Sequence, residues 1–469
     1  MSSVSCDMGA GRVAEVAWPI SLPARAHQRQ SDERLHHGVC RSSALHLETL
    51  ARIHRATMVR TRLEPHHAAF LSTHAGEQHD EQTPIPGRCG DAGGGGGGTA
   101  DSGTLRLALT DAPACGYDEV NVTVEKIRVH QSSSAGENER GWSEIVLATP
   151  SKINLLDLTN GALIELGETR LPAGTYTQLR LVLAANPGNP NVPLANSIRL
   201  SAIPEGSGQE IPLKTPSGQQ SGLKINVNMT VEADQRADFV LDFDACKSVV
   251  VAGNSGNYNL KPVVRAILRT ETGVIGEVLP AMAGAAVSLQ LDGLPVRSTV
   301  ADAEGKFRLW PVESGTYTLV VTAPGRATAV VKNVVVSQNQ IVRVTPDGTD
   351  IAPAVSATGT LRGLVAYNPV ATPIDATVNA WQSLPGGTTI QLVSRPVDMD
   401  TGAYVLGDLA VGAPEVATFF ANGTPIFTPE GTVAGKLRVS AVSGGITRTS
   451  SELTLTPMDD QTVPNFTFP

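Results

Sequence analysis

Apolar and polar residues alternate with a period of two along most of the chain beyond residue 101. Leu105, Leu107 and Leu109 occupy every second position, and residues 120–124 repeat this pattern. The same alternation returns at residues 179–183, 225–231 and 239–243. A period of two places successive side chains on opposite faces of a strand. Because one face is polar, we expect antiparallel sheets that pack face to face and bury their apolar sides.

Residues 302–325 contain the clearest local pattern, which is turn, strand, turn, strand, turn. Asp302 and Gly305 predict the first turn, because Asp accepts hydrogen bonds from nearby backbone amides and Gly readily adopts positive φ. Parts of this pattern recur elsewhere. The run Gly-Thr-Tyr-Thr occurs at 174–177 and again at 315–318, and a second acidic turn spans 398–402. Such repetition predicts a series of small sandwich modules.

The chain is long enough for three domains of ordinary size. We expect an all-β protein with tandem antiparallel β-sandwiches of the transthyretin-like or immunoglobulin-like kind. The predicted parts are a disordered leader with a glycine tether (1–101), three sandwiches (102–270, 271–345 and 357–469), and a linker rich in Pro, Ala and Asp (346–356).

Four runs in the first sandwich carry a family resemblance. They are residues 105–113, 120–130, 153–158 and 171–176. In order and content they resemble the bacterial domain of unknown function 4382 family. The resemblance implies an exported β-sandwich, often lipid-anchored, with no established activity.

The second sandwich resembles the carboxypeptidase regulatory-like module, a seven-stranded transthyretin-like domain, through residues 276–280, 284–289, 302–325 and 334–344. The third resembles it more distantly, because residues 412–418 stand where the Gly-Thr-Tyr run is expected. This resemblance imports no zinc ligands, since those of the peptidase lie in a different domain.

The net charge of −9 argues against nucleic acid as a partner, because no basic face is available to neutralise phosphates. Only 4% of the residues are aromatic, and Gly and Pro number 46 and 31, which suits short strands joined by tight turns. No run of 18 apolar residues occurs, so we expect membrane contact only through a lipid anchor.

Cys89 precedes six glycines at 93–98, which is the layout of a lipidated cysteine followed by a flexible tether. This predicts an extracytoplasmic, lipid-anchored or secreted protein of the bacterial cell envelope. The apolar segment and small-residue cleavage site of a signal peptide are not evident before Cys89, where Pro86 and Arg88 stand instead. Residues 1–88 hold nine of the ten histidines without regular ligand spacing, so a disordered segment is favoured over a metal site there.

Cys115 and Cys246 each follow an Ala near the end of a strand. A disulfide between them would close a loop of about 130 residues and stabilise the fold by about 4–5 kcal/mol in the chain-entropy model. Two unlinked buried thiols are the alternative.

Two acidic turns are candidate metal sites. Asp302 and Glu304, like Asp398 and Asp400, place two carboxylates two residues apart beside a glycine, a spacing that could bind Ca²⁺. The alternative is a solvated turn in which Asp caps backbone amides. No other cofactor is indicated.

Exposed aromatic rings are the candidate ligand-binding groups, because a pyranose face stacks on an aromatic ring. The candidates are Trp142, Trp381 and Tyr404, whereas Trp310 is expected to pack in a core. Core packing is also the alternative for each candidate.

No catalytic residues are predicted. His130 is the one histidine beyond residue 88, no Gly-x-Ser-x-Gly run marks a nucleophile elbow, and no HExxH run is present. Asp242 and Asp244 flank Phe243 on what we expect to be a solvated strand face. The chain is therefore predicted to be a non-enzymatic envelope protein that binds a carbohydrate or another surface component. The alternatives are a structural or adhesion stalk with protein partners, and an accessory subunit of a secreted hydrolase.

Overall fold

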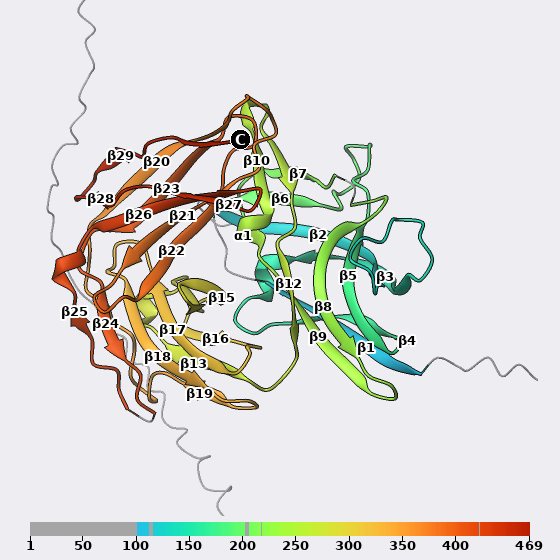
Figure 1. Cartoon of the computed structure of the whole chain (residues 1–469), viewed down its shortest axis with the longest axis horizontal. Coiled ribbons are helices and arrows are strands. Elements are labelled where there is room, and N and C mark those ends of the chain that lie inside the picture. Colours follow the sequence, from blue (N-terminus) through green and yellow to red (C-terminus); the bar gives the residue numbers. More distant parts are fainter. Residues whose placement is uncertain (1–100, 112–115, 202–205, 217, 422) are drawn as a thin grey trace, which may run out of the picture. The chain divides into compact units, whose positions relative to one another are not determined.

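The computed structural model of the chain describes residues 101–111, 116–201, 206–216, 218–421 and 423–469 (Figure 1). These residues form β-strands with a single short α-helix, α1 (Ala245–Ser248), and four short 3-10 turns. The prediction of an all-β protein with tandem sandwiches is confirmed. The predicted leader and Cys89 lie outside the described residues. No helix in the described part of the chain is long and apolar enough to cross a membrane.

The first sandwich consists of two sheets. One has the order β12-β9-β1-β4, from β12 (Val264–Leu268), β9 (Arg236–Phe243), β1 (Ser102–Asp111) and β4 (Ile164–Pro172). The other has the order β10-β11-β7-β6-β2-β5-β8, with β3 paired to β2. Its strands are β10 (Val249–Ala252), β11 (Asn257–Leu260), β7 (Glu210–Lys214), β6 (Ser197–Leu200), β2 (Tyr117–His130), β5 (Gly174–Leu183), β8 (Leu223–Val231) and β3 (Ser143–Asn154).

The sequence predicts antiparallel sheets, but the sheets of this sandwich also contain parallel pairs. Strand β1 pairs with β9 in parallel, with Leu107 opposite Phe239. The two strands are far apart in the sequence, so no hairpin forces them to run in opposite directions. Alternation alone reports which face of a strand is buried and carries no information about strand direction.

The alternating apolar positions do face the core, as predicted. Leu105, Leu107 and Leu109 are at most 1% exposed, and Phe239 and Leu241 join the same cluster from the neighbouring strand. Burying each such side chain stabilises the fold by about 1.5–3 kcal/mol.

The second sandwich has a sheet of order β16-β13-β19 and a sheet that begins β15-β14-β17-β18. Its strands are β13 (Gly273–Glu277), β14 (Ala286–Leu291), β15 (Leu294–Val300), β16 (Lys306–Leu309), β17 (Gly315–Thr322), β18 (Ala329–Val336) and β19 (Ile341–Arg343).

The third sandwich has one sheet of order β23-β20-β29, with β30 also on β20, and one of order β22-β21-β26-β27, with β28 on β26. Its strands are β20 (Thr358–Tyr367), β21 (Thr377–Ser383), β22 (Thr389–Pro396), β23 (Ala403–Ala410), β26 (Lys436–Ser443), β27 (Ile446–Thr449), β28 (Leu453–Thr454), β29 (Asp460–Thr462) and β30 (Phe466–Phe468).

Two segments cross the predicted boundary between the second and third sandwiches. Strand β24 (Glu415–Thr418) pairs in parallel with β18 and so extends a sheet of the second sandwich, followed by β25 (Thr428–Pro429). In the predicted linker, Ile351 is fully buried and its amide donates to the Glu277 carbonyl over 2.8 Å. Residues 346–356 therefore pack against the second sandwich instead of forming a free tether.

Buried polar contacts join the modules to one another. Arg297 of β15 forms an ion pair with Asp242 of β9, and their side chains are 1% and 9% exposed. The Arg297 guanidinium also donates to Thr110 Oγ1 over 3.1 Å. Asp242, expected on a solvated face, is thus buried, because that strand face is covered by the next module.

A second buried contact joins the second and third sandwiches. Gln290 Nε2 donates to the Gln391 carbonyl over 2.7 Å, and the Gln391 amide donates back to Gln290 Oε1 over 2.9 Å. Both side chains are at most 7% exposed. Each of these two boundaries thus contains buried polar groups whose partners come from the neighbouring module.

The substitution Arg297→Met should lower the free energy of unfolding by about 3 kcal/mol, because it leaves the Asp242 carboxylate buried without its partner. Urea unfolding of the full chain measures this. Arg297→Met combined with Asp242→Leu should recover much of the loss. The exposed pair Arg362–Asp460 supplies the control, since Arg362→Met should change stability by less than about 1 kcal/mol. If Arg297→Met and Arg362→Met lowered the free energy of unfolding equally, the buried pair would have no special role in stability.

Candidate functional site

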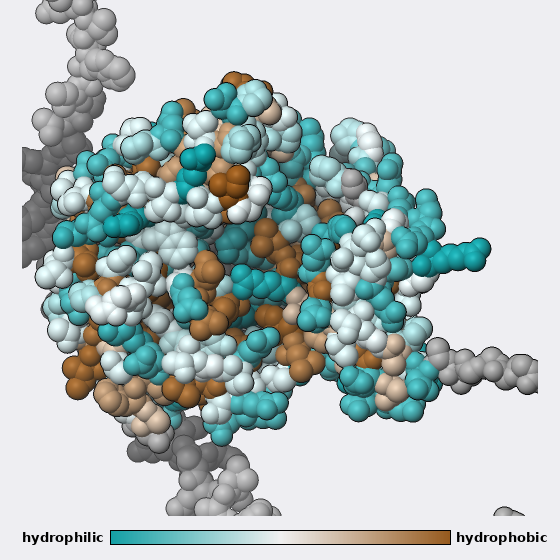
Figure 2. All heavy atoms as spheres, in the orientation of Figure 1, coloured by the Kyte–Doolittle hydropathy of each residue, from teal (hydrophilic) through white to brown (hydrophobic). Residues whose placement is uncertain are grey.

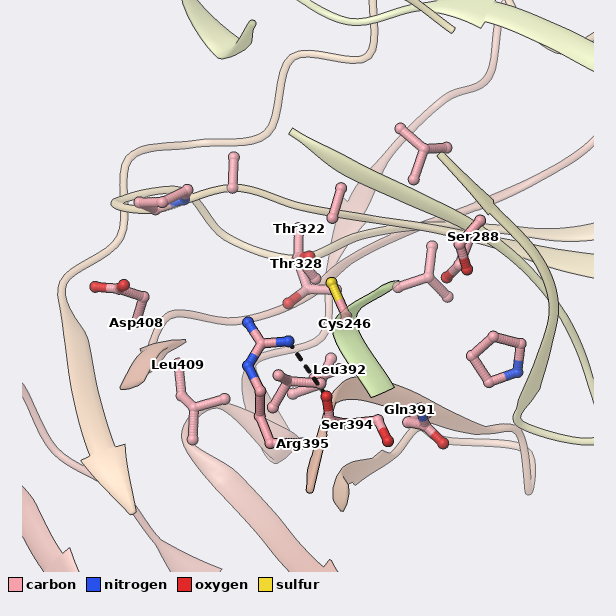
Figure 3. A pocket seen from close by; sticks show the side chains of 18 of the residues that line it. Cys246, Ser288, Thr322, Thr328, Gln391, Leu392, Ser394, Arg395, Asp408 and Leu409 are labelled. Carbon is pink, nitrogen blue, oxygen red and sulfur yellow. Dashed lines mark hydrogen bonds between the residues drawn. The ribbon is translucent and has the colours of Figure 1, made fainter. Parts of the chain in front are cut away.

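The candidate site is a pocket of about 310 Å³ that is lined by residues of all three sandwiches. Helix α1 contributes Cys246 from the first module (Figure 3), together with Lys247. The second module contributes Ser288, Thr322 and Thr328, and the third contributes Gln391, Ser394, Arg395 and Asp408.

Helix α1 is held in place at its first turn. Asp244 caps it, since its Oδ1 accepts from the Lys247 amide over 3.0 Å and its Oδ2 accepts from Lys247 Nζ over 2.6 Å. The Ala245 amide donates to the Oδ1 of buried Asp111 over 3.0 Å. These bonds attach the helix to the end of strand β1 and pair the charge of Lys247 with that of Asp244.

Arg395 is the charged side chain that reaches into the pocket. It lies on β22, and Figure 3 shows its guanidinium between Asp408 and Cys246. Its Nη1 donates to the Ser394 carbonyl over 3.2 Å. Among the described residues no carboxylate lies within ion-pair distance of it. Burial lowers the pKa of Arg395, and this effect is opposed by the nearby Tyr117 and Asp244.

Hydroxyl groups form much of the rest of the lining. Ser288, Thr322 and Ser394 come from strands β14, β17 and β22, and Thr328 comes from the loop before β18. Ser394 is 8% exposed, and within the described part of the chain its Oγ has no hydrogen-bond partner. A buried hydroxyl without a partner is unfavourable, so this group is suited to receive a bond from a ligand or from water.

The two acidic turns have the same local structure. Asp302 Oδ1 accepts from the amides of Glu304 (3.1 Å) and Lys306 (2.8 Å). Asp398 Oδ1 accepts from the amides of Asp400 (3.0 Å) and Thr401 (2.8 Å). The glycines that follow, at 305 and 402, have φ of 82° and 70°, which only glycine adopts readily.

The second oxygen of each Asp contacts the first sandwich. Asp302 Oδ2 accepts from Asn160 Nδ2 over 3.3 Å, and Asp398 Oδ2 accepts from the Gly253 amide over 3.0 Å. The Met399 amide donates to the Val251 carbonyl over 3.0 Å beside the second contact. The turns therefore both cap themselves and attach their modules to the first sandwich.

This geometry favours the capping alternative over calcium binding. The first carboxylate of each turn already accepts N–H bonds on both oxygens, and the second carboxylates, Glu304 and Asp400, are exposed. Among the described residues no group of three or more His, Cys, Asp or Glu side chains could hold a metal ion.

Trp142 is occupied by contacts within its own module. Its Nε1 donates to the Gly136 carbonyl over 2.9 Å. The guanidinium carbons of Arg128 and Arg180 lie 4.7 and 4.9 Å from the ring centroid, and the His130 ring lies 5.1 Å away. Cation–π contacts of this kind stabilise the fold and leave less of the ring available to a sugar.

The other two aromatic candidates also have contacts within their own module. Trp381 Nε1 donates to Ser440 Oγ over 2.7 Å in a part-buried position. Tyr404 is 4% exposed and belongs to the core of the third sandwich, and burial raises the pKa of its phenol. A ring enclosed in the core cannot stack on a pyranose, which corrects the assignment of Tyr404 as a ligand-binding residue. The structure does not bring the three candidates together.

Cys89 and Cys115 lie outside the described residues. Cys246 lines the pocket. Ala245, the residue before it, donates its amide to Asp111, which precedes Cys115 by four residues in the sequence. The Cys115–Cys246 disulfide and the lipidation of Cys89 stay predictions.

Sequence reasoning missed Arg395, Ser394 and Asp408. They lie within strands β22 and β23, and no sequence motif marks them. Only the meeting of the modules shows that they share one pocket.

The substitution Asp398→Ala should destabilise the protein by about 1–2 kcal/mol, because it removes a turn cap together with the bond to Gly253. Thermal unfolding with and without Ca²⁺ measures this, and Ca²⁺ should leave the melting temperature unchanged. Asp400→Ala is the matched control and should have little effect. A melting temperature that rises with Ca²⁺, and no longer does so in either variant, would instead establish a calcium site.

Comparison with solved structures gives only remote similarity. The Bacillus anthracis TIE protein is 12% identical, with a TM-score of 0.15 over 78% of this chain and 51% of its own. A streptococcal ancillary pilin is 12% identical, with a TM-score of 0.13 over 77% of this chain and 99% of its own. BcpA, the major pilin subunit of Bacillus cereus, is 9% identical, with a TM-score of 0.14 over 78% and 99%.

The chain spans about half the length of the TIE protein. Similarity at this level carries no functional argument. No curated protein sequence matches the chain.

Family models give a specific result for two segments. Residues 102–262 match the domain of unknown function DUF4382, and residues 275–347 match the carboxypeptidase regulatory-like domain. Both matches agree with the order of resemblances in the sequence. The first sandwich is therefore similar to the DUF4382 domain, and the second is similar to the carboxypeptidase regulatory-like domain.

Proposed function

We propose that this protein is a non-enzymatic β-sandwich protein of the bacterial cell envelope that binds a carbohydrate or another surface component in the three-module pocket. The observation that carries the proposal is the pocket itself. It combines a guanidinium without an ion-pair partner among the described residues, a buried hydroxyl without a hydrogen-bond partner there, and further Ser and Thr hydroxyls. Convergent polar groups in a concave site are typical of small-ligand binding.

The aromatic residues expected to stack on a sugar support carbohydrate binding less well than the pocket does. Trp142 stacks on arginines and Tyr404 lies in a core. The proposed binding therefore depends on hydrogen bonds and charge within the pocket.

A stalk with protein partners is the second candidate, and the module interfaces favour it. The buried pair Arg297–Asp242 and the paired amides of Gln290 and Gln391 stiffen the contacts between modules. A rigid series of modules suits a spacer as well as a binding scaffold. The two candidates differ in whether the pocket holds a ligand.

The proposed location depends on cysteine chemistry. Lipidation of Cys89 would anchor the protein, and a Cys115–Cys246 disulfide would form in an oxidising compartment. Mass mapping of peptides without reduction, on protein from its native host, should find the linked pair. Two unmodified thiols at 115 and 246 would count against an oxidising location.

Carbohydrate binding is tested with the full chain on a glycan array. We expect at least one saccharide to bind, and Thr322→Trp should weaken that binding at least tenfold because the indole fills the pocket. Thr447→Trp, on the exposed strand β27, is the matched control and should bind normally. Trp142→Ala should also retain binding. Silence of the unaltered protein across all glycans would favour the stalk.

A further inference from the structure

We propose that the three-module pocket binds the carboxylate of an acidic sugar, with Arg395 as the residue that contacts it. This inference rests on the proposed carbohydrate-binding function and names its ligand class. The candidate is a uronic-acid type of saccharide, which combines one carboxylate with several hydroxyl groups.

The charge of Arg395 is the first argument. Arg395 is partly buried, so its guanidinium loses part of its hydration, which a carboxylate or several hydrogen-bond acceptors can replace. Within the described part of the chain, Arg395 donates to the Ser394 carbonyl and has no carboxylate within ion-pair distance. The planar guanidinium fits a carboxylate with two parallel hydrogen bonds. An anionic ligand would therefore supply what the protein does not.

The other charged groups of the pocket do not compete for this role. Lys247 is paired with Asp244 over 2.6 Å. Asp408 is exposed at the rim and forms no ion pair among the described residues. As far as the described residues go, the pocket thus offers one cation without an ion-pair partner, Arg395, and one such carboxylate at its edge, Asp408. A carboxylate at the edge can accept hydrogen bonds from ligand hydroxyls, which a simple inorganic anion such as sulfate lacks.

The hydroxyl groups are the second argument. Ser394 Oγ is buried and has no hydrogen-bond partner in the part of the chain that the structure describes, and Thr322 and Thr328 line the same space. Ser and Thr hydroxyls both donate and accept, as sugar hydroxyls do. The volume of about 310 Å³ is at the small end of ligand pockets, which suits one sugar unit better than an extended chain.

Isothermal titration of the full chain tests the inference with three probes, D-glucuronate, D-glucose and sulfate. Glucuronate should bind at least tenfold more tightly than either glucose or sulfate. Arg395→Gln should reduce glucuronate affinity at least tenfold, to the level of glucose, and Arg395→Lys should retain part of the affinity. Arg140→Gln, at an exposed arginine outside the pocket, is the matched control and should bind like the unaltered protein.

A substitution at an exposed pocket residue separates loss of binding from loss of folding. Asp408→Asn lies at the rim and should weaken glucuronate binding severalfold while leaving the melting temperature unchanged. Binding of sulfate as tight as that of glucuronate would overturn the inference in favour of a general anion site. Equal binding of glucose and glucuronate, unaffected by Arg395→Gln, would overturn it while leaving carbohydrate binding intact. Absence of binding by every saccharide would overturn both proposals.

Discussion

The arrangement of the pocket depends on polar side chains that are buried at the module boundaries and bonded across them. The pair between Arg297 and Asp242 is one example, since neither charge could stay buried without the other. The paired amides of Gln290 and Gln391 impose the same condition on the next boundary. A buried polar group restricts geometry more than an apolar contact does, because a hydrogen bond depends on direction as well as distance. The residues that line the pocket are held together by these contacts.

The acidic turns show how one local motif serves two purposes. Within its own hairpin, each Asp caps backbone amides beside a glycine with positive φ, as at Asp302 and Gly305. Its remaining oxygen then accepts a bond from the first sandwich, from Asn160 in one case and Gly253 in the other. The repetition of the motif in the second and third modules thus repeats a docking contact.

Each family match covers one module, whereas the pocket is formed by three. The DUF4382 and carboxypeptidase regulatory-like assignments describe single modules. The proposed binding site belongs to no single module, because its residues come from all three. A function described for either family alone would therefore not account for the pocket.

The strands named from alternation, their buried faces and the two acidic turns follow from the sequence alone, because these features depend on neighbours within a few residues. Leu105, Leu107 and Leu109 face the core as their spacing predicts. The parallel pairing of β1 with β9 and the transfer of β24 to the second sandwich required the tertiary structure, since strand partners are chosen by contacts distant in the sequence. Contacts distant in the sequence also explain why Asp242 and Tyr404, both expected to be exposed, are buried. The polar strand face that carries Asp242 is buried because another module covers it. The ring of Tyr404 is buried because it belongs to the core of the third sandwich. Arg395 has no sequence motif, and only the packing of three modules around it makes it the charged centre of a site.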